Sequence, residues 1–433
     1  MSRELIGVIA IVILFVLMLW RCWIGIAMTI VGFIGVWLLR GLPQALSILG
    51  SVPFAKCSNY NLTAIPMFLL MGMIIAETSL GAGLYRCANA WLGRVRGGLA
   101  SATAVASGLL GAICSQTMTG AIIMSKIAYP EMKKRDYEDG FACASIAAGA
   151  PLSIIIPPSM CFIMYGILTE NSVGRLFISG VVPGLILMVL YCIAVTIVIS
   201  KKPEWGPRGD KMSLKEKLKA TKEVIPVGIL FLIVLGGIYS GVVSTTESGA
   251  IGAAGALIIA LLTKQMTWKK LGDCIKQTAR IGASIWILMS GTYVFSAFLT
   301  LSNLPQAIAS VAAGLNASRY VCIILVMILY LIMGMFIPDN VIVVLTVPIL
   351  YPVMVTTLGC DPIWFGTFCV FMVAMAQVSP PVGMVVYYLG GLTDVPIQKI
   401  FRGILPFLFC MIVVVLLLIF FPALSTWLPS IMR

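Results

Sequence analysis

The sequence predicts an all-α polytopic membrane protein with about ten transmembrane helices and two re-entrant helical hairpins in an inverted repeat. First, 60% of the 433 residues are hydrophobic and 10% are charged, whereas soluble domains have about 45–50% and about 25%. Second, the apolar residues form about ten runs of roughly 16–25 residues, each able to cross a hydrocarbon core as a helix. Third, polar and helix-breaking landmarks recur at matched spacings in the two halves, which indicates a duplicated architecture.

The N-terminal elements are apolar runs that we interpret as transmembrane helices. The run from Leu5 to Trp20 has no small-residue cleavage site after it, and a second run begins at Ile24, which argues against a signal peptide. We assign residues 1–62 to N-terminal scaffold helices.

The longest charged segment, residues 201–224, holds eight Lys or Arg against four acids. The positive-inside rule makes it a cytoplasmic basic loop. Counting spans outward from it places both termini outside and puts Ser51–Asn61, Ser302–Arg319 and Val353–Asp361, each with at most one base, on the outer side. Because the basic residues cluster beside apolar runs, the net charge of +13 does not indicate a nucleic-acid partner.

The repeat is visible in the spacing of four landmarks. Thr117 precedes Pro157 by 40 residues, and Asn340 precedes Pro380 by 40. Gly180 and Gly403 follow those prolines by 23 residues, and Pro183 and Pro406 follow them by 26. We therefore expect a first repeat over 63–200, scaffold helices of the second half over 225–280, and a second repeat over 281–433.

Each repeat contains two short apolar runs around a polar break, at 99–130 and at 321–352. Runs too short to span the membrane that meet at a polar tip predict re-entrant hairpins. Five bases flank the first hairpin (Arg94, Arg96, Lys133, Lys134 and Arg135), whereas Arg319 alone flanks the second. The hairpins are therefore expected to enter from opposite sides, which gives the inverted repeat.

A Pro-Pro pair in each repeat predicts a helix broken into two half-helices, because proline cannot continue the preceding helix but suits the first turn of the next. The freed carbonyls can bind a cation, and the amide-rich N-terminus of the second half can face an anion. Near these breaks and the hairpin tips we predict the substrate-binding residues, which are Gln116, Pro157, Pro158, Ser159, Asp339, Gln377, Pro380 and Pro381.

The hairpin tips are rich in neutral oxygen donors, which suit Na⁺ rather than a soft metal. The predicted sodium-binding residues are Ser115, Thr117, Asn340 and Ser379. Hydroxyls in membrane helices also commonly bond to the preceding turn, so a purely structural role stays open for each of them. No other metal or cofactor is predicted.

Catalytic chemistry is poorly supported. The chain has no histidine and no G-x-x-x-x-G-K-[ST] phosphate loop, which removes imidazole-activated nucleophiles and that route to ATP hydrolysis. Four acids, namely Glu77, Glu170, Glu247 and Asp394, fall at span ends, where we interpret them as solvated caps. Asp339 is the acid with a suggestive position at membrane depth.

Motifs along nearly the whole chain resemble one transporter family. They are Ala64-Ile65-Pro66-Met67-Phe68 with Met71-Gly72, Gly97-Gly98-Leu99-Ala100, Pro130-Glu131-Met132, Ile156-Pro157-Pro158-Ser159 with Tyr165-Gly166, Asp361-Pro362 with Phe365-Gly366, Pro380-Pro381-Val382-Gly383 and Gly403-Ile404-Leu405-Pro406-Phe407. In this order they are similar to the large membrane subunit of tripartite ATP-independent periplasmic (TRAP) transporters, within the ion transporter superfamily. The family usually has Ser-Gly-Ser-Ser where this chain has Cys114-Ser115-Gln116-Thr117, Thr where Ser379 stands and Gly where Ala376 stands.

The resemblance implies an elevator-type, multi-pass protein of the bacterial inner membrane. It also implies a small four-helix membrane subunit, expected as a separate polypeptide, and a periplasmic substrate-binding protein as partners. The predicted function is the large permease subunit of a sodium-driven transporter that imports a small organic anion. A standalone Na⁺-coupled organic-anion carrier of related fold is the alternative, and an intramembrane enzyme or a channel is a more distant one. Sialic acid, dicarboxylates, keto acids and sulfonates all stay open as substrates. The amphipathic stretch from Leu84 to Leu92 is expected to lie along the membrane interface as an arm between domains.

Overall fold

The computed structural model describes residues 2–209, 212–314 and 319–432. Its helices are α1 (Arg3–Leu19), α2 (Ile24–Arg40), α3 (Leu42–Cys57), η1 (Tyr60–Thr63), α4 (Ala64–Ala76), α5 (Leu80–Leu92), α6 (Gly98–Cys114), α7 (Thr117–Lys133), α8 (Asp139–Gly149), α9 (Leu152–Ile155), α10 (Met160–Thr169), α11 (Val173–Lys201), η2 (Pro203–Trp205), α12 (Leu214–Tyr239), α13 (Thr245–Leu262), α14 (Trp268–Ser302), α15 (Leu304–Gly314), α16 (Arg319–Gly334), α17 (Asp339–Tyr351), the π-helix η3 (Pro352–Thr357), α18 (Pro362–Ala376), α19 (Met384–Thr393), α20 (Ile397–Phe420) and α21 (Ala423–Ser430). Residues 210–211 of the predicted basic loop and 315–318 of the predicted outer segment Ser302–Arg319 lie outside the described residues. Within the described ranges, β structure is limited to one isolated antiparallel bridge between Arg96 and Arg208.

The predicted all-α membrane fold is confirmed. Among the described residues, seven helices are long and apolar enough to cross a membrane, or up to eight if the bent pair α3 and η1–α4 counts as one span. This is fewer than the ten expected, because α1 and α2 have 17 residues each and fall just short of that length.

The order of elements in the first half recurs in the second half, and the two halves align at their Pro-Pro pairs. α6–α7 and α16–α17 are both helix pairs around a polar break, and α8–α10 and α18–α19 are both helices interrupted at Pro-Pro. The broken helices are followed by α11 and α20, each with one internal proline, Pro183 and Pro406. In the first half a bend of 62° separates α3 from η1–α4, whereas the second half has the unbroken 35-residue α14 in the corresponding place.

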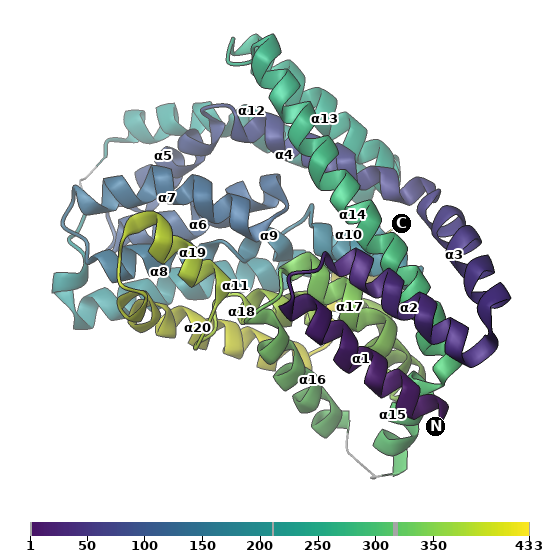
Figure 1. Ribbon diagram of the computed structural model, residues 1–433. Helices are drawn as coiled ribbons and strands as arrows, with labels where there is room; N and C mark the ends of the chain where they lie inside the picture. Colours follow the sequence, from purple (N-terminus) through teal and green to yellow (C-terminus); the bar gives the residue numbers. More distant parts are fainter. Residues whose placement is uncertain (1, 210–211, 315–318, 433) are drawn as a thin grey trace.

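The helices form an outer arch and an inner body. Figure 1 shows α3, α4, α12, α13 and α14 along the upper and right side, with both hairpins and the broken helices below them. In the arch, α2 packs on α14 and α4 packs on α13; in the body, α8 packs on α20 and α10 packs on α17. The halves also exchange contacts, since α12 packs on α5 and α1 packs on α15. The arm predicted at Leu84–Leu92 is thus part of α5, which joins the arch to the body.

Small residues let α2 and α14 approach closely. A Cβ added to Gly291 would lie 2.0 Å from the carbonyl oxygen of Gly25, and a Cβ added to Gly25 would lie 2.6 Å from that of Ile287. Any side chain at either position would therefore collide with backbone. Close backbone approach through small residues is a common way for membrane helices to associate, because lipid provides no hydrophobic drive between them.

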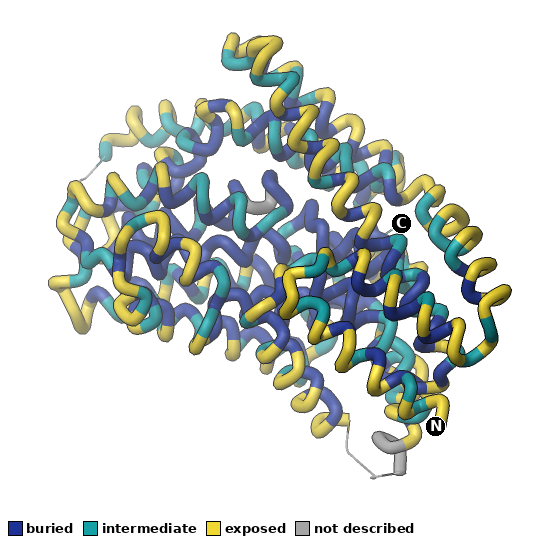
Figure 2. The backbone as a smooth tube through the Cα atoms, viewed as in Figure 1, coloured by how far each residue is buried: buried dark blue, intermediate teal, exposed yellow. Residues whose placement is uncertain are grey.

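Burial separates the two parts of the molecule. In Figure 2 the middle of the inner body is largely buried, and exposed positions lie along the arch, on α16 and at the ends of the body. All residues of α8 after Asp139 and all residues of α18 after Pro362 are buried. The exposed positions of α12 include Leu232 and Ile233, as expected for a helix that faces lipid.

The basic segment is only partly a loop. The predicted loop covered residues 201–224, but α12 begins at Leu214, so the loop proper is shorter. The physical reason is a capping box: the Ser213 side chain accepts from the Glu216 amide, and the Glu216 carboxylate accepts from the Ser213 amide at 2.7 Å, which satisfies two amides that would otherwise lack a partner. Likewise α14 runs without a break through the predicted boundary at 280–281.

The first part of that loop is held against the inner body. The Tyr137 hydroxyl donates to the carbonyl oxygen of Pro207 at 3.2 Å, and the Glu138 amide donates to that of Trp205 at 3.2 Å. The Trp205 ring also lies 5.4 Å from that of Phe141 in α8, measured between centroids. Residues 203–209 are therefore a strap across one end of the body rather than a free linker.

Candidate functional site

The two hairpin breaks fall where the sequence predicts tips. α6 ends at Cys114 and α7 begins at Thr117; α16 ends at Gly334 and α17 begins at Asp339. Ser115 turns the first chain with a positive φ of 54°, a conformation that few residues other than glycine adopt. The Thr117 hydroxyl donates to the Asp339 carboxylate at 2.8 Å. The tips of the two hairpins thus contact each other directly across 222 residues of sequence.

Each tip is also hydrogen-bonded to the Pro-Pro break of its own repeat. The Ser115 hydroxyl donates to the carbonyl oxygen of Pro158 at 2.9 Å. The side-chain amide of Gln377 donates to the carbonyl oxygen of Ile337 at 3.0 Å. Both Pro-Pro bonds are cis. Four polar segments far apart in the sequence therefore meet at one place inside the body.

The hydroxyl oxygens at this place keep lone pairs available. Besides Ser115 and Thr117, the Ser159 hydroxyl donates to Ile154 O at 2.5 Å and the Ser379 hydroxyl donates to Met375 O at 2.7 Å. All four residues are at most 5% exposed. Because each hydroxyl proton is directed to a protein acceptor, the oxygen can still accept, which is the requirement for a cation ligand. The bonds of Ser159 and Ser379 to preceding carbonyls also match the purely structural interpretation.

Asn340 and Gln116 are placed differently from the hydroxyls. The Asn340 side-chain oxygen accepts from the Val341 amide at 3.0 Å, and the side-chain oxygen of Gln116 accepts from the Thr119 hydroxyl at 3.0 Å. Asn340 also lines a cleft of about 410 Å³ between the second tip and the arch, together with Cys22, Trp23, Ile24, Gly25, Ile281, Ser284, Ile285, Ile287, Leu288 and Val341. Asn340 therefore faces the arch, whereas Ser115, Thr117 and Ser379 are tied to the tips and breaks.

The two Pro-Pro pairs differ in exposure. Pro157 and Pro158 are buried, whereas Pro380 and Pro381 are exposed. The site is thus closed on the side of the first break and accessible on the side of the second. In this conformation the predicted substrate contacts at Pro380 and Pro381 lie at its open end.

Sequence reasoning missed the residues that hold the site together. The carbonyl oxygens of Pro158 and Ile337 each accept a bond from a predicted site residue, and Ser284 of α14 lines the cleft opposite the second tip. Backbone carbonyls carry no sequence signal, and nothing in the pattern of α14 distinguishes Ser284. The four acids interpreted as caps do lie at helix ends: Glu77, Glu170 and Asp394 are C-caps, and Glu247 belongs to a capping box.

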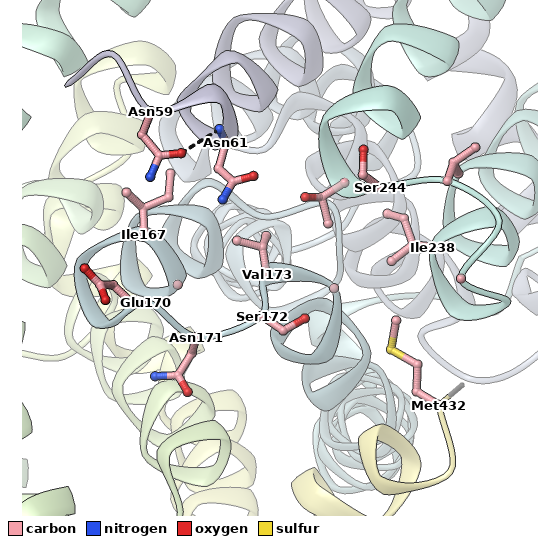
Figure 3. A pocket seen from close by; sticks show the side chains of 15 residues that line it. Asn59, Asn61, Ile167, Glu170, Asn171, Ser172, Val173, Ile238, Ser244 and Met432 are labelled. Carbon is pink, nitrogen blue, oxygen red and sulfur yellow. Dashed lines mark hydrogen bonds between the residues drawn. The ribbon is translucent and has the colours of Figure 1, made fainter. Parts of the chain in front are cut away.

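A second, polar pocket of about 410 Å³ lies away from the tips (Figure 3). Asn59 and Asn61 line it from the η1 segment, Glu170 and Asn171 from the turn after α10, and Ser244 from the turn before α13. Near it, Lys56 of α3 and Glu170 form an ion pair at 3.2 Å. The pocket contains none of the predicted site residues, but it marks where arch and body meet on the predicted outer side.

An all-helical body with paired hairpins and broken helices is the architecture of a polytopic membrane protein, and the family match below makes it a transporter and not an enzyme. Residues 11–424 match the family described as "Tripartite ATP-independent periplasmic transporter, DctM component". The chain belongs to this family, and its localisation is the bacterial inner membrane, with multiple spans.

Relatives of known name agree with this assignment. The chain is 31% identical to the C4-dicarboxylate TRAP transporter large permease protein DctM of Pseudomonas aeruginosa, over 90% of each chain. It is 28% identical to the sialic acid TRAP transporter large permease protein SiaM of Vibrio cholerae, over 86% of this chain and 87% of that one. Among solved structures, the YdaH transporter of Alcanivorax borkumensis shares the fold with a TM-score of 0.59 at 13% identity, over 89% and 88% of the two chains.

Proposed function

We propose that this chain is the large permease subunit of a sodium-driven TRAP transporter that imports a small organic anion by an elevator motion. The observation that carries the proposal is the convergence of both tips and both breaks, joined by the Thr117–Asp339, Ser115–Pro158 and Gln377–Ile337 bonds. This arrangement gathers hydroxyl, carboxylate and carbonyl oxygens in a buried place, which suits a hard cation.

Sodium is favoured over a proton as the coupling ion. Proton coupling normally needs a titratable group at membrane depth, and Asp339 is the acid that the structure places at the tips. Its Oδ2 atom accepts the Thr117 hydroxyl and its Oδ1 atom accepts the Asn340 amide at 2.8 Å. Both carboxylate oxygens thus act as acceptors within the tips, beside neutral oxygens of the kind that suit a hard cation.

An elevator motion is supported by the division into arch and body. The body carries the whole tip site, and the cleft beside Asn340 lies between that site and the arch. Movement of the body past the arch would open this cleft on one side and close it on the other. Since the relatives transport different solutes, as their names state, the proposal leaves the anion itself open.

The proposed partners are a small four-helix membrane subunit and a periplasmic binding protein. Reconstitution tests them: we expect Na⁺-dependent uptake in proteoliposomes that hold all three components and none in vesicles with this subunit alone. Robust sodium-dependent uptake by the purified subunit would instead favour the standalone carrier. A panel of sialic acid, dicarboxylates, keto acids and sulfonates, each with its binding protein, would identify the anion.

A further inference from the structure

Three exposed arginines gather where α5 leads into the first hairpin. Arg94 and Arg96 lie in the turn between α5 and α6, and an antiparallel backbone bridge places Arg208 of the strap beside Arg96. The Gly209 amide donates to the carbonyl oxygen of Gly93 at 3.1 Å, which fixes the strap on this turn. In the described part of the chain, none of the three guanidinium groups forms an ion pair with an acid. The fold therefore concentrates like charge here, and the acids of the described residues do not pair with it.

The arginine turn lies at one end of an apolar groove. A Cβ added to Gly97 would lie 2.7 Å from side-chain atoms of both Val195 and Ile199, so the turn packs directly on the last part of α11. The groove, of about 580 Å³, begins beside that contact. It is lined by Leu92, Val105, Met188, Val189, Cys192, Ile193, Thr196 and Ile197.

The residues that line the groove favour an apolar ligand. Thr196 contributes a hydroxyl to the lining, but this hydroxyl already donates to the Cys192 carbonyl oxygen at 2.9 Å. Val189, Ile193 and Ile197 are each about half exposed. A hydrocarbon chain buries such a surface without leaving a polar group unpaired.

We infer that this surface binds an anionic phospholipid of the cytoplasmic leaflet. One acyl chain lies in the groove between α6 and α11, and the phosphate is held by Arg94, Arg96 and Arg208. Guanidinium groups bind phosphate through paired hydrogen bonds, and the positive-inside rule places this end of α11 at the cytoplasmic surface, where anionic headgroups attract basic residues. The apolar lining alone would also fit a transmembrane helix of a partner protein, but the three charges beside it favour a ligand that carries an anionic group.

The inference does not depend on sodium coupling or on the substrate. It concerns the turn that joins the arm α5 to the first hairpin, so a bound lipid would fix that turn to the leaflet surface. Binding is therefore measurable on the purified full chain, without partners and without transport.

The test is lipid retention by the purified full chain, measured by native mass spectrometry. The chain is titrated with phosphatidylglycerol or with phosphatidylcholine of the same acyl chains. We expect phosphatidylglycerol to bind at least about 10-fold more tightly. The triple variant Arg94→Gln, Arg96→Gln, Arg208→Gln should lose this preference and bind the two lipids about equally. The matched triple variant Lys215→Gln, Lys219→Gln, Lys222→Gln removes the same charge from α12, none of whose residues lines the groove, and should keep the preference.

A groove-filling variant separates the acyl chain from the headgroup. Ile193→Trp leaves every charge in place and should weaken phosphatidylglycerol binding at least about 10-fold, and soluble glycerophosphate should not compete with the lipid at equal concentration. The inference is overturned if both lipids bind equally, if the two triple variants lose binding equally, or if Ile193→Trp binds like the wild type. Competition by glycerophosphate would likewise show a simple anion site instead of a lipid site. Ile193→Trp also decides the matter if the arginine variant does not purify as a single species.

Discussion

At the scale of single residues, the direction of each hydroxyl proton determines what the tip oxygens can still do. Thr117 donates to Asp339, and Ser379 donates to the carbonyl of the preceding helical turn. Both oxygens are buried and keep lone pairs that can accept. A cation at the tips would therefore complete an arrangement in which the protons already point away from it.

The hydroxyls should contribute to sodium affinity. We expect Thr117→Ala and Ser379→Ala each to raise the Na⁺ concentration for half-maximal uptake by roughly 5- to 150-fold, from the loss of about 1–3 kcal/mol of ligand interaction in a dry site. Uptake against sodium concentration in proteoliposomes measures this. The control is Ser145→Ala, which removes an equally buried hydroxyl of α8 that donates to Phe141 O at 2.8 Å, outside the tips. If all three variants raise the Na⁺ concentration for half-maximal uptake equally, the tip hydroxyls have a structural role and are not sodium ligands.

Most tip residues could be named from the sequence, but their contacts could not. Matched spacing around Pro157 and Pro380 located the tips, because helix breaks depend on local residue types. The Thr117–Asp339 bond joins residues 222 positions apart and depends on how the hairpins pack. Asn340 occupies the same place in the second repeat as Thr117 in the first, but it lines the cleft toward the arch. This difference also depends on how the helices pack and could not be predicted from the spacing.

At the scale of elements, the sequence predicted the helices well and their ends less well. The predicted hairpins at 99–130 and 321–352 agree closely with α6–α7 and α16–α17. The basic loop was predicted too long because hydropathy does not register the capping box that starts α12 among charged residues. The strap contacts of Trp205 and Tyr137, again long-range, had no signal in the sequence.

The opposite orientation of the hairpins is a prediction that labelling can test. In a background without native cysteines, Lys133→Cys at the end of α7 should react only from the cytoplasm, and Thr357→Cys at the end of η3 only from outside. Both positions are exposed, so a failure to react would reflect the side of the membrane and not burial. Labelling with an impermeant maleimide in whole cells and in inverted vesicles measures this, and reaction from the same side would refute the inverted repeat.

At the scale of the whole molecule, arch and body are joined on the predicted outer side by the Lys56–Glu170 ion pair. Its side chains are 51% and 80% exposed, so the pair itself contributes little stability. The pair instead reports on the position of the body relative to the arch, because it connects α3 of the arch to the end of α10 in the body. An elevator motion must separate these two residues.

A covalent bridge between them should stop transport. In the cysteine-free background, Lys56→Cys with Glu170→Cys, linked by a short reducible bifunctional reagent, should lose at least about 90% of uptake and recover it on reduction. The control pair Glu131→Cys with Lys134→Cys lies at the C-terminal end of α7, where the same bridge should leave uptake unchanged. Full uptake with the Lys56–Glu170 bridge closed would rule out a motion of the body past the arch at this contact.

The most direct test of sodium coupling compares two gradients in proteoliposomes that contain the three components. An inward Na⁺ gradient without a pH difference should drive uptake, and a pH gradient without sodium should not. Asp339→Asn keeps an oxygen that accepts the Thr117 hydroxyl and should retain sodium-driven uptake at lower sodium affinity. The sodium assignment would be contradicted if the pH gradient alone drives wild-type uptake, Asp339→Asn abolishes it, and Thr117→Ala and Ser379→Ala behave like the wild type.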